Sequence, residues 1–285
     1  MTNHTAMISS PIGLIAGGGV LPFSVADSLS ARGIDPVLFA LKGVSDPVAV
    51  ARFRHHWISI GQLGKLAKLL RSENCRDLVF IGTLVRPALS EISLDWGTLR
   101  VIGRVWAAFR GGDDHLLSGI GRIFEQDGFR MVGIKDVAPD LLMPEGHLTR
   151  TSPDKDAAAD IARGHDVLRA LGPFDIGQAA VVIDGHVVAV EDIEGTDGLL
   201  ARVARLRAEG RIRAKAGRGV LVKAPKVGQD LRFDLPTVGP RTLEGTAAAR
   251  LAGMAVAAGN AIVVEPQAMI ERADSAGLFV IGFPT

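Results

Sequence analysis

Short apolar segments alternate with helix-length segments in the first half of this 285-residue chain, and this alternation constrains the fold most. The segment between the last two apolar runs carries Leu and Ala at positions i, i+3, i+4 and i+7, one face of a helix. Strands without polar alternation are buried on both faces, so the pattern predicts a parallel sheet with helices on either side. The apolar runs are Ile12–Ala16, Pro36–Leu41, Trp57–Ile60 and Leu78–Gly82.

The alternation stops at Lys135–Pro153, which contains three prolines and predicts a linker. Beyond it we expect a helix over residues 154–171, a hairpin at Asp184-Gly185 between two apolar runs, and a helix over residues 241–258. The predicted fold class is α/β with a linker joining two domains. These are an N-terminal Rossmann-like domain with a parallel sheet (1–134), the linker (135–153) and a C-terminal mixed α/β catalytic domain (154–285).

Composition excludes several classes of protein. A net charge of +1, 5% aromatic residues and no Tyr give neither the charge nor the stacking surface that nucleic-acid binding needs. The single cysteine, Cys75, cannot form a disulfide framework, which favours a reducing cytoplasm. The first ten residues lack the features of a signal peptide, and no apolar run approaches the roughly 18 residues of a transmembrane helix.

Three consecutive glycines, Gly17–Gly19, follow the first predicted strand. A strand, a glycine turn and a helix start together present backbone N–H groups to an anion such as a phosphate. The dinucleotide fingerprint is absent, because Pro22 stands at its third glycine and Lys42 stands where its acidic residue belongs. A P-loop is also absent. From spacing alone, a phosphate site and a purely structural tight turn are both open.

Two further positions follow predicted strands in the N-terminal half. Arg86, in GTLVRPAL, could clamp a phosphate or carboxylate, or be an ordinary surface arginine. Asp113 and Asp114, in RGGDDHLL, suit a helix N-cap, and the one not capping could orient a ligand or a hydrated cation.

Carboxylates concentrate where the predicted hairpin leads into a helix. Four of them occupy seven positions beside Gly195 and Thr196, more than a helix start requires, although Thr196 could be a simple cap. Hard oxygen ligands of this kind suit hydrated Mg²⁺. They are Glu191, Asp192, Glu194 and Asp197.

The densest polar stretch covers residues 219–242. Lys223 and Lys226 precede Asp230, Arg232 and Asp234, and the last three would share one side of an extended segment. Cations and carboxylates after an apolar strand suit phosphate binding with metal or general-base chemistry. A solvated, charged edge strand is the alternative.

Seven motifs occur in an order that resembles one bacterial family, the magnesium-dependent UDP-2,3-diacylglucosamine pyrophosphatases of lipid A synthesis in Gram-negative bacteria. This family is distinct from the metallophosphoesterase type. The resemblance runs from about Ile12 to Phe283. The motifs are GLIAGGGVLP, GTLVRPAL, GGDD, FDIGQAAVV, AVEDIEGTDGLLARV, GVLVKAPKVGQDLRFDLPTVG and GLFVIG.

The resemblance implies two α/β domains with a lipid substrate between them. It implies hydrolysis of UDP-2,3-diacylglucosamine to 2,3-diacylglucosamine 1-phosphate (lipid X) and UMP, with water attacking the β-phosphorus. Asp234 matches the essential aspartate of the family motif R-x-D-L-P-T-[IV]-G, and the E-G-T-D motif matches Glu194 to Asp197. Gly198 stands where relatives often carry a larger residue, which leaves the start of the helix less defined.

On these grounds we predict a site for this chemistry. Asp234 serves as metal ligand or water-orienting base, with Asp230 and Asp197 as partners, while Lys223 and Arg86 neutralise phosphate oxygens. Mg²⁺ is the predicted cofactor, held by Asp234 and Asp230. Residues predicted to bind substrate are Gly17, Gly18, Gly19, Leu21, Lys42, Thr83, Arg86, Asp113, Gln178, Glu194, Gly195, Thr196, Lys226, Arg232 and Thr237.

The predicted partners are the lipid-linked nucleotide sugar, the cytoplasmic face of the inner membrane through peripheral contact, and a second copy of the chain in a homodimer. The high apolar content, 47%, fits a substrate with two acyl chains. Two other functions stay open: another nucleotide-sugar enzyme such as a glycosyltransferase, and a non-catalytic nucleotide- or lipid-binding module.

Overall fold

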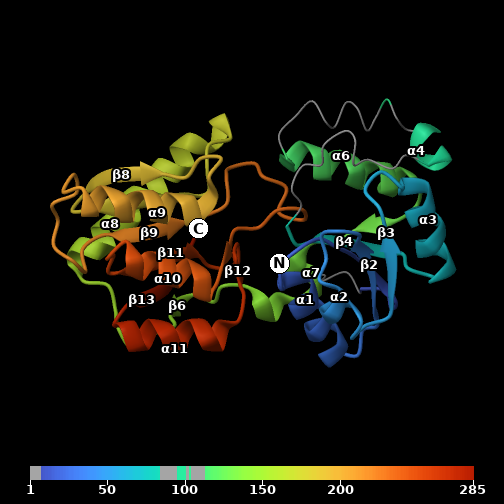
Figure 1. Ribbon diagram of the computed structural model, residues 1–285, viewed down its shortest axis with the longest axis horizontal. Helices are drawn as coiled ribbons and strands as arrows, with labels where there is room; N and C mark the ends of the chain where they lie inside the picture. The colour runs from blue at the N-terminus through green and yellow to red at the C-terminus, as the bar shows by residue number, and fades with distance from the viewer. Residues whose placement is uncertain (1–7, 84–94, 101–102, 104–112) are drawn as a thin grey trace, which may run out of the picture. The chain divides into compact units, whose positions relative to one another are not determined.

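The computed structural model describes residues 8–83, 95–100, 103 and 113–285 (Figure 1). The chain divides into two compact units. Unit 1 comprises Met1–Asp140 and Asp230–Asp234, and unit 2 comprises Leu141–Gln229 and Leu235–Thr285. The short segment Asp230–Asp234 therefore belongs to unit 1, although it comes from the C-terminal half of the chain.

Unit 1 is built on a five-stranded sheet with the order β3-β2-β1-β4-β5, and all four pairings are parallel. This is the order of a Rossmann-like sheet, in which the first strand lies at the centre. The predicted α/β fold class, with an N-terminal parallel sheet, is confirmed. The strands are β1 (Ile12–Ala16), β2 (Pro36–Leu41), β3 (His55–Ile58), β4 (Asp77–Ile81) and β5 (Arg130–Met131).

Helices cover this sheet, and α3 shows most clearly the apolar face that such a helix presents to the strands. In α3 the buried residues are Leu66, Ala67 and Leu70, which share the helix face expected from their spacing. They join Phe39, Leu78 and other strand residues in one core cluster. The helices of unit 1 are α1 (Leu21–Ala31), α2 (Pro47–Val50), α3 (Leu63–Ser72), α4 (Trp96–Arg100), α6 (Asp113–Gln126) and α7 (Ile134–Val137).

Unit 2 contains a six-stranded mixed sheet with the order β6-β13-β11-β9-β7-β8. The pairs β9–β11 and β11–β13 are parallel, whereas β7 pairs antiparallel with both β8 and β9. A separate two-stranded parallel sheet joins β10 to β12. The strands are β6 (Gly146–His147), β7 (Ala179–Ile183), β8 (His186–Val190), β9 (Val220–Lys223), β10 (Thr237–Val238), β11 (Gly253–Ala257), β12 (Ile262–Val263) and β13 (Phe279–Phe283).

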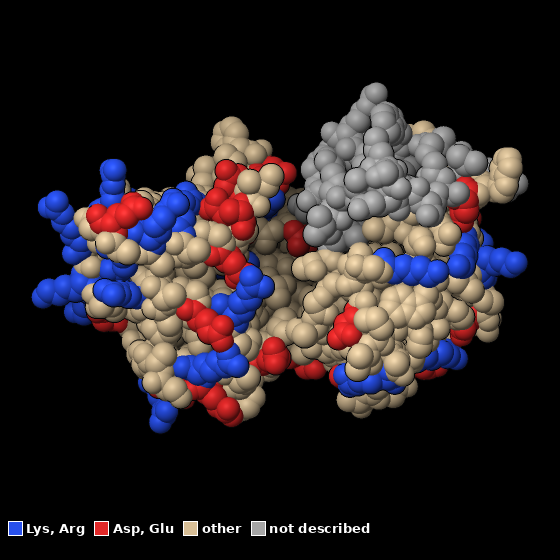
Figure 2. All heavy atoms as spheres, viewed as in Figure 1, with Lys and Arg blue, Asp and Glu red and all other residues tan. Residues whose placement is uncertain are grey.

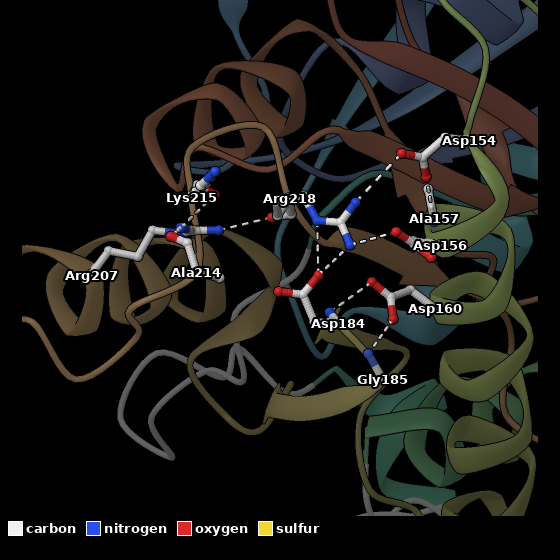
Figure 3. Close-up of polar contacts among 10 residues, drawn as sticks. All are labelled: Asp154, Asp156, Ala157, Asp160, Asp184, Gly185, Arg207, Ala214, Lys215 and Arg218. Carbon is white, nitrogen blue, oxygen red and sulfur yellow. Dashed lines mark hydrogen bonds and ion pairs between the residues drawn. The ribbon is translucent and has the colours of Figure 1, made fainter.

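The hairpin predicted at Asp184-Gly185 is present between β7 and β8. Both residues have positive φ, +50° and +76°, as the preferred two-residue hairpin turn requires. The carboxylate of Asp160, only 2% exposed, accepts hydrogen bonds from both turn amides at 3.1 and 2.6 Å (Figure 3). The turn is therefore fastened to helix α8, which carries Asp160.

Helices cover both faces of the mixed sheet. Side chains of β9 alternate, so that Val220 and Val222 pack with α8 while Leu221 packs with α9, α10 and α11. The helices are α8 (Lys155–Leu171), the short 3-10 helix η3 (Gly172–Phe174), α9 (Gly195–Ala208), α10 (Pro240–Ala248) and α11 (Pro266–Ala276). Within the described ranges, none of the helices is long and apolar enough to cross a bilayer.

The helix expected over residues 241–258 is wrong in its second half. Helix α10 ends at Ala248, and Gly253–Ala257 forms β11 in the centre of the sheet. The small apolar residues of this run fit either structure by pattern, but a Cβ at Gly253 would lie 2.2 Å from the Phe279 carbonyl oxygen. Close approach of two backbones therefore selects the strand.

One guanidinium fixes the loop that leads into β9. Arg218 pairs with Asp156 at 2.7 Å and Asp184 at 2.6 Å, and Asp154 lies at 3.5 Å (Figure 3). Arg207 of α9 donates to carbonyl oxygens in the same loop. Figure 2 shows Lys and Arg side chains projecting from the end of unit 2 that carries this loop.

The change from unit 1 to unit 2 falls at Asp140, inside the stretch interpreted as a linker. That stretch has short elements of its own: α7, a 3-10 turn at Pro139–Leu141, and β6, which pairs antiparallel with β13. Its prolines interrupt the alternation of longer elements, as the sequence indicates. Its first part, to Asp140, belongs to unit 1, and the rest belongs to unit 2.

Candidate functional site

Lys223 occupies the edge of the mixed sheet where ligands bind in α/β folds. It is the last residue of β9, at the carboxyl ends of the parallel strands β9, β11 and β13. Its side chain is only 6% exposed. The ammonium donates to the Thr196 hydroxyl at 2.7 Å and to the Thr237 carbonyl oxygen at 3.1 Å. The structure thus brings together three of the predicted site residues.

The Thr196 hydroxyl connects this lysine to a carboxylate. It donates to Glu191 Oε1 at 3.2 Å, and Glu191 Oε2 accepts the Gln178 N–H at 3.2 Å. Gly195 begins α9 with φ of +69°, a conformation that glycine adopts without strain. Thr196 is not the N-cap, contrary to the simple interpretation of this helix start. The N-cap is Glu194, without a capping side-chain bond, so the hydroxyl of Thr196 is used elsewhere.

Other predicted residues of unit 2 form ion pairs that are partly or well exposed. Asp197 pairs with Arg241 at 2.8 Å, with side chains 48% and 84% exposed. Glu194 accepts from Arg202 at 2.6 Å, and the Lys226 ammonium pairs with a carboxylate in the loop after η3. All of these side chains are more exposed than Lys223, which is the buried one.

The segment Asp230–Asp234 forms a turn on unit 1. The segment is not extended, because the Phe233 N–H donates to the Asp230 carbonyl oxygen at 3.0 Å and the Asp234 N–H donates to it at 3.4 Å. The Asp230 carboxylate accepts from Arg232 Nε at 3.0 Å and Nη2 at 2.8 Å. Arg232 thereby holds the pKa of Asp230 below its usual range, against the opposing effect of burial.

Two contacts anchor this turn to the sheet and helices of unit 1. Arg232 also pairs with Glu125 of α6 at 2.8 Å. The centroids of the Phe233 and Phe80 rings are 6.1 Å apart. A Cβ added at Gly121 would lie only 2.4 Å from the edge of the Phe233 ring. The glycine on α6 thus makes room for the ring that fixes the turn preceding Asp234.

The glycine turn after β1 uses its first two amides internally. Gly17 N–H donates to the Ile81 carbonyl and Gly18 N–H to the Thr83 carbonyl, both at 2.8 Å. A Cβ at Gly17 would lie 2.6 Å from the Thr83 oxygen, so the crossing of two turns explains this glycine. Within the described residues, the amides of 19–21 have no such partner, and these could meet an anion.

The remaining predicted residues of unit 1 differ in how they are placed. Lys42 is exposed just after β2, and Thr83 exchanges backbone hydrogen bonds with Gly18. Helix α6 begins at Asp113, whose side chain is outside the described residues. Arg86 also lies outside the described residues.

The predicted magnesium ligands can be tested against their surroundings. No group of three or more His, Cys, Asp and Glu side chains suited to a metal occurs among the described residues. Mg²⁺ commonly uses one or two carboxylates with substrate phosphates and water, so a single carboxylate suffices in principle. The Asp230 carboxylate fits this role poorly, because the Arg232 guanidinium engages both of its oxygens.

Three residues outside the predicted set shape these sites. Glu191 was one of the clustered carboxylates, and its position directly after β8 is the signal that could have selected it. Phe233 is the one aromatic residue within a polar stretch. The buried Ser45 hydroxyl donates to the Ala16 carbonyl at 2.7 Å, fixing the turn after β1, and no pattern in the sequence marks it.

The two units and the sites they carry define an α/β enzyme-like protein with a Rossmann-like unit and a mixed-sheet unit. Models of the LpxI N-terminal domain and the LpxI C-terminal domain match residues 11–141 and 144–281. The chain is 42% identical to the UDP-2,3-diacylglucosamine pyrophosphatase LpxI of Caulobacter vibrioides over 271 residues, 95% of this chain and 96% of that protein. The chain belongs to the LpxI family, and the predicted family resemblance is confirmed.

Proposed function

We propose that this chain hydrolyses the pyrophosphate bond of UDP-2,3-diacylglucosamine in lipid A biosynthesis of a Gram-negative bacterium. The 42% identity over nearly the whole length of both chains carries this proposal. A water oxygen bonds to the β-phosphorus, the bond from that phosphorus to the bridging oxygen breaks, and the bridging oxygen leaves with UMP. The sugar keeps the β-phosphate as lipid X.

The buried cation of unit 2 supports phosphate chemistry. Lys223 lies at a sheet edge suited to ligands, beside the E-G-T-D turn that opens α9. The proposed catalytic carboxylate, Asp234, follows Lys223 in the same polar stretch of the sequence. We assign Lys223 to stabilising charge on the diphosphate and Asp234 to orienting water or holding the metal.

Mg²⁺ is the proposed cofactor, with Asp234 as its protein ligand. When bound, the ion would neutralise phosphate oxygens and help position the in-line displacement. A chelator tests this directly. Excess EDTA is expected to abolish UMP release, and added Mg²⁺ to restore it, whereas full activity in EDTA would remove the metal from the proposal.

The function is tested by UMP release from UDP-2,3-diacylglucosamine in detergent, with the reaction run in ¹⁸O-labelled water. We expect one ¹⁸O atom in the phosphate of lipid X and none in UMP. Release of UDP instead would indicate a glycosyltransferase, and no release would leave a binding module. Asp234→Ala is expected to lose at least about 100-fold in kcat. Asp27→Ala, which removes an exposed aspartate from a surface ion pair, is the matched control and keeps the parent rate.

Peripheral contact with the cytoplasmic face of the inner membrane is also proposed. Three neighbouring segments of unit 2, η3 and two loops, expose apolar side chains at Phe174 (72%), Ile193 (101%) and Val227 (58%). Side chains of this kind bind weakly to bilayers by partial insertion. Flotation with vesicles of phosphatidylethanolamine and phosphatidylglycerol is the test. The parent is expected to float, and the triple serine variant at these positions is expected to stay at the bottom.

The homodimer stays a prediction. Sedimentation velocity of the full chain in detergent-free buffer checks it, with a dimer mass near twice the 30.0 kDa of the chain as the expected result. A monomer at all concentrations up to those of the assay would contradict it.

A further inference from the structure

Hydrogen bonds join three side chains in a row: Lys223, Thr196 and the carboxylate of Glu191. Lysine can only donate, so the Thr196 oxygen accepts its proton at 2.7 Å. The Thr196 hydroxyl then directs its own proton to Glu191 Oε1 at 3.2 Å. The direction of every hydrogen bond is therefore fixed: ammonium to hydroxyl, and hydroxyl to carboxylate.

The place of this ammonium calls for a compensating negative charge. Thr196 is in the first turn of α9, and the amino end of a helix carries partial positive charge that repels a cation. Lys223 is only 6% exposed, so water does little to offset this repulsion. Glu191 is the carboxylate that the hydroxyl connects to the ammonium.

Glu191 is held firmly enough to orient its neighbour. Its N–H donates to the Ala179 carbonyl at 2.8 Å, and its Oε2 accepts the Gln178 N–H at 3.2 Å. Ala179 is paired with Lys223 itself in the β7–β9 register. Glu191 directly follows β8 and Lys223 ends β9, and β7 lies between these two strands and pairs with both.

We propose that Glu191 is a positioning residue, which fixes the Lys223 ammonium at the strand edge by orienting the Thr196 hydroxyl. The inference rests on the proposed function, since it assigns the purpose of the arrangement to phosphate chemistry. Glu191 itself touches no substrate in this scheme. Its charge acts on the reaction only through Thr196, and this dependence separates positioning from a general structural role.

A double-mutant cycle on the full-length protein measures that dependence. Glu191→Gln is expected to lower kcat for UMP release about tenfold, the size of a lost charge-assisted hydrogen bond, with KM within twofold of the parent. Thr196→Val is expected to lower kcat at least as much, and Thr196→Ser to restore most of it. In the Thr196→Val background, Glu191→Gln is expected to have no further effect. The proposal would be overturned if the double variant lost the product of the two single-variant losses in kcat. It would also be overturned if the kcat of Glu191→Gln were within twofold of the parent.

A second readout needs no substrate. The amine of Lys223 is acylated with N-hydroxysuccinimidyl acetate in the native protein, and its modification rate is followed by peptide mass spectrometry. Glu191→Gln and Thr196→Val are expected to raise this rate at least tenfold. Glu209→Gln, which removes an exposed carboxylate at the other end of α9, serves as the matched control and leaves it unchanged.

The two readouts separate the ways in which the scheme could fail. If the parent releases no UMP while both variants expose Lys223, the proposed function has failed and the positioning stands. If the parent is active and Lys223 is modified at the parent rate in both variants, the positioning by Glu191 is refuted. Should Thr196→Val not fold, Glu191→Gln and Thr196→Ser still decide between these outcomes.

Discussion

Replacing Phe233 by alanine is expected to loosen the turn that precedes Asp234. This ring is the apolar anchor of Asp230–Asp234 on unit 1, packed against Phe80 and over Gly121. It joins the core cluster that also contains Cys75. The same cluster therefore holds both the anchor to be removed and a thiol that can report on its loss.

The expected cost is about 2 kcal/mol of unfolding free energy. Truncating a fully buried Phe to Ala costs roughly 3–5 kcal/mol, and the half-buried Phe233 loses about half of that range. The lost aromatic pair with Phe80 is included in this figure. At about 1.4 kcal/mol for each factor of ten, 2 kcal/mol corresponds to roughly a 30-fold larger population of opened molecules.

Cys75 makes the opening measurable, because it is the single thiol of the chain and is 3% exposed. Burial, reinforced by the nearby Glu73 charge, raises the pKa of Cys75 to about 12, so the closed protein presents almost no thiolate at pH 8. Labelling by an aromatic disulfide reagent at pH 8 and low urea then tracks the opened population. Phe233→Ala is expected to speed this labelling about 30-fold.

Two controls frame this result. Phe233→Leu keeps apolar bulk and loses only the ring, so it is expected to give a severalfold increase. Phe174→Ala removes a ring that is 72% exposed on unit 2 and is expected to leave the labelling of Cys75 unchanged. A labelling rate for Phe233→Ala within threefold of the parent would refute the anchoring of the turn by this ring.

Three further predictions follow from the conformations and charges of single residues. Gly195→Ala is expected to lower the unfolding free energy by about 1–2 kcal/mol in urea denaturation, since φ is +69° and an added Cβ meets no other atom. Arg232 lowers the pKa of Asp230 in the folded protein, so their ion pair stabilises the fold fully at pH values above 3.8, the pKa in the unfolded state. This stabilisation is lost as the pH falls through the lower pKa of the folded state. The free energy of unfolding in urea is expected to fall over that interval in the parent and less in Arg232→Gln. Arg218→Ala is expected to lower Tm in calorimetry, less so in high salt, by leaving its three aspartate partners facing one another.

The sheet of unit 1 could be predicted because its information is local. Strands β1, β2 and β4 are short, largely apolar runs, and the helix between β3 and β4 shows its buried face in the spacing of its leucines. The strand β11 could not be predicted in the same way. Its residues, Gly253–Ala257, are small and apolar and suit a helix by pattern, while the contact that selects a strand comes from Phe279 on β13.

The candidate site divides along the same line between local and distant information. The sequence indicated which residue types gather at the strand ends, and Lys223, Thr196 and Thr237 do meet there. It did not indicate which hydrogen bonds these residues make, because the partners lie 14 and 27 positions from the lysine. Glu191 was visible only as one of four carboxylates, and its connection to the lysine depends on the return of β8 beside β7.

The glycine turn after β1 shows why residue type alone does not define a binding site. Its glycines are needed, but the first two serve the crossing with the turn after β4, where Gly18 and Thr83 exchange both backbone hydrogen bonds. An anion at this turn would therefore meet the amides of 19–21, at the start of α1, where the positive end of the helix also contributes. Since Pro22 follows at the second helical position without an N–H, any phosphate contact made by this turn involves at most three successive amides.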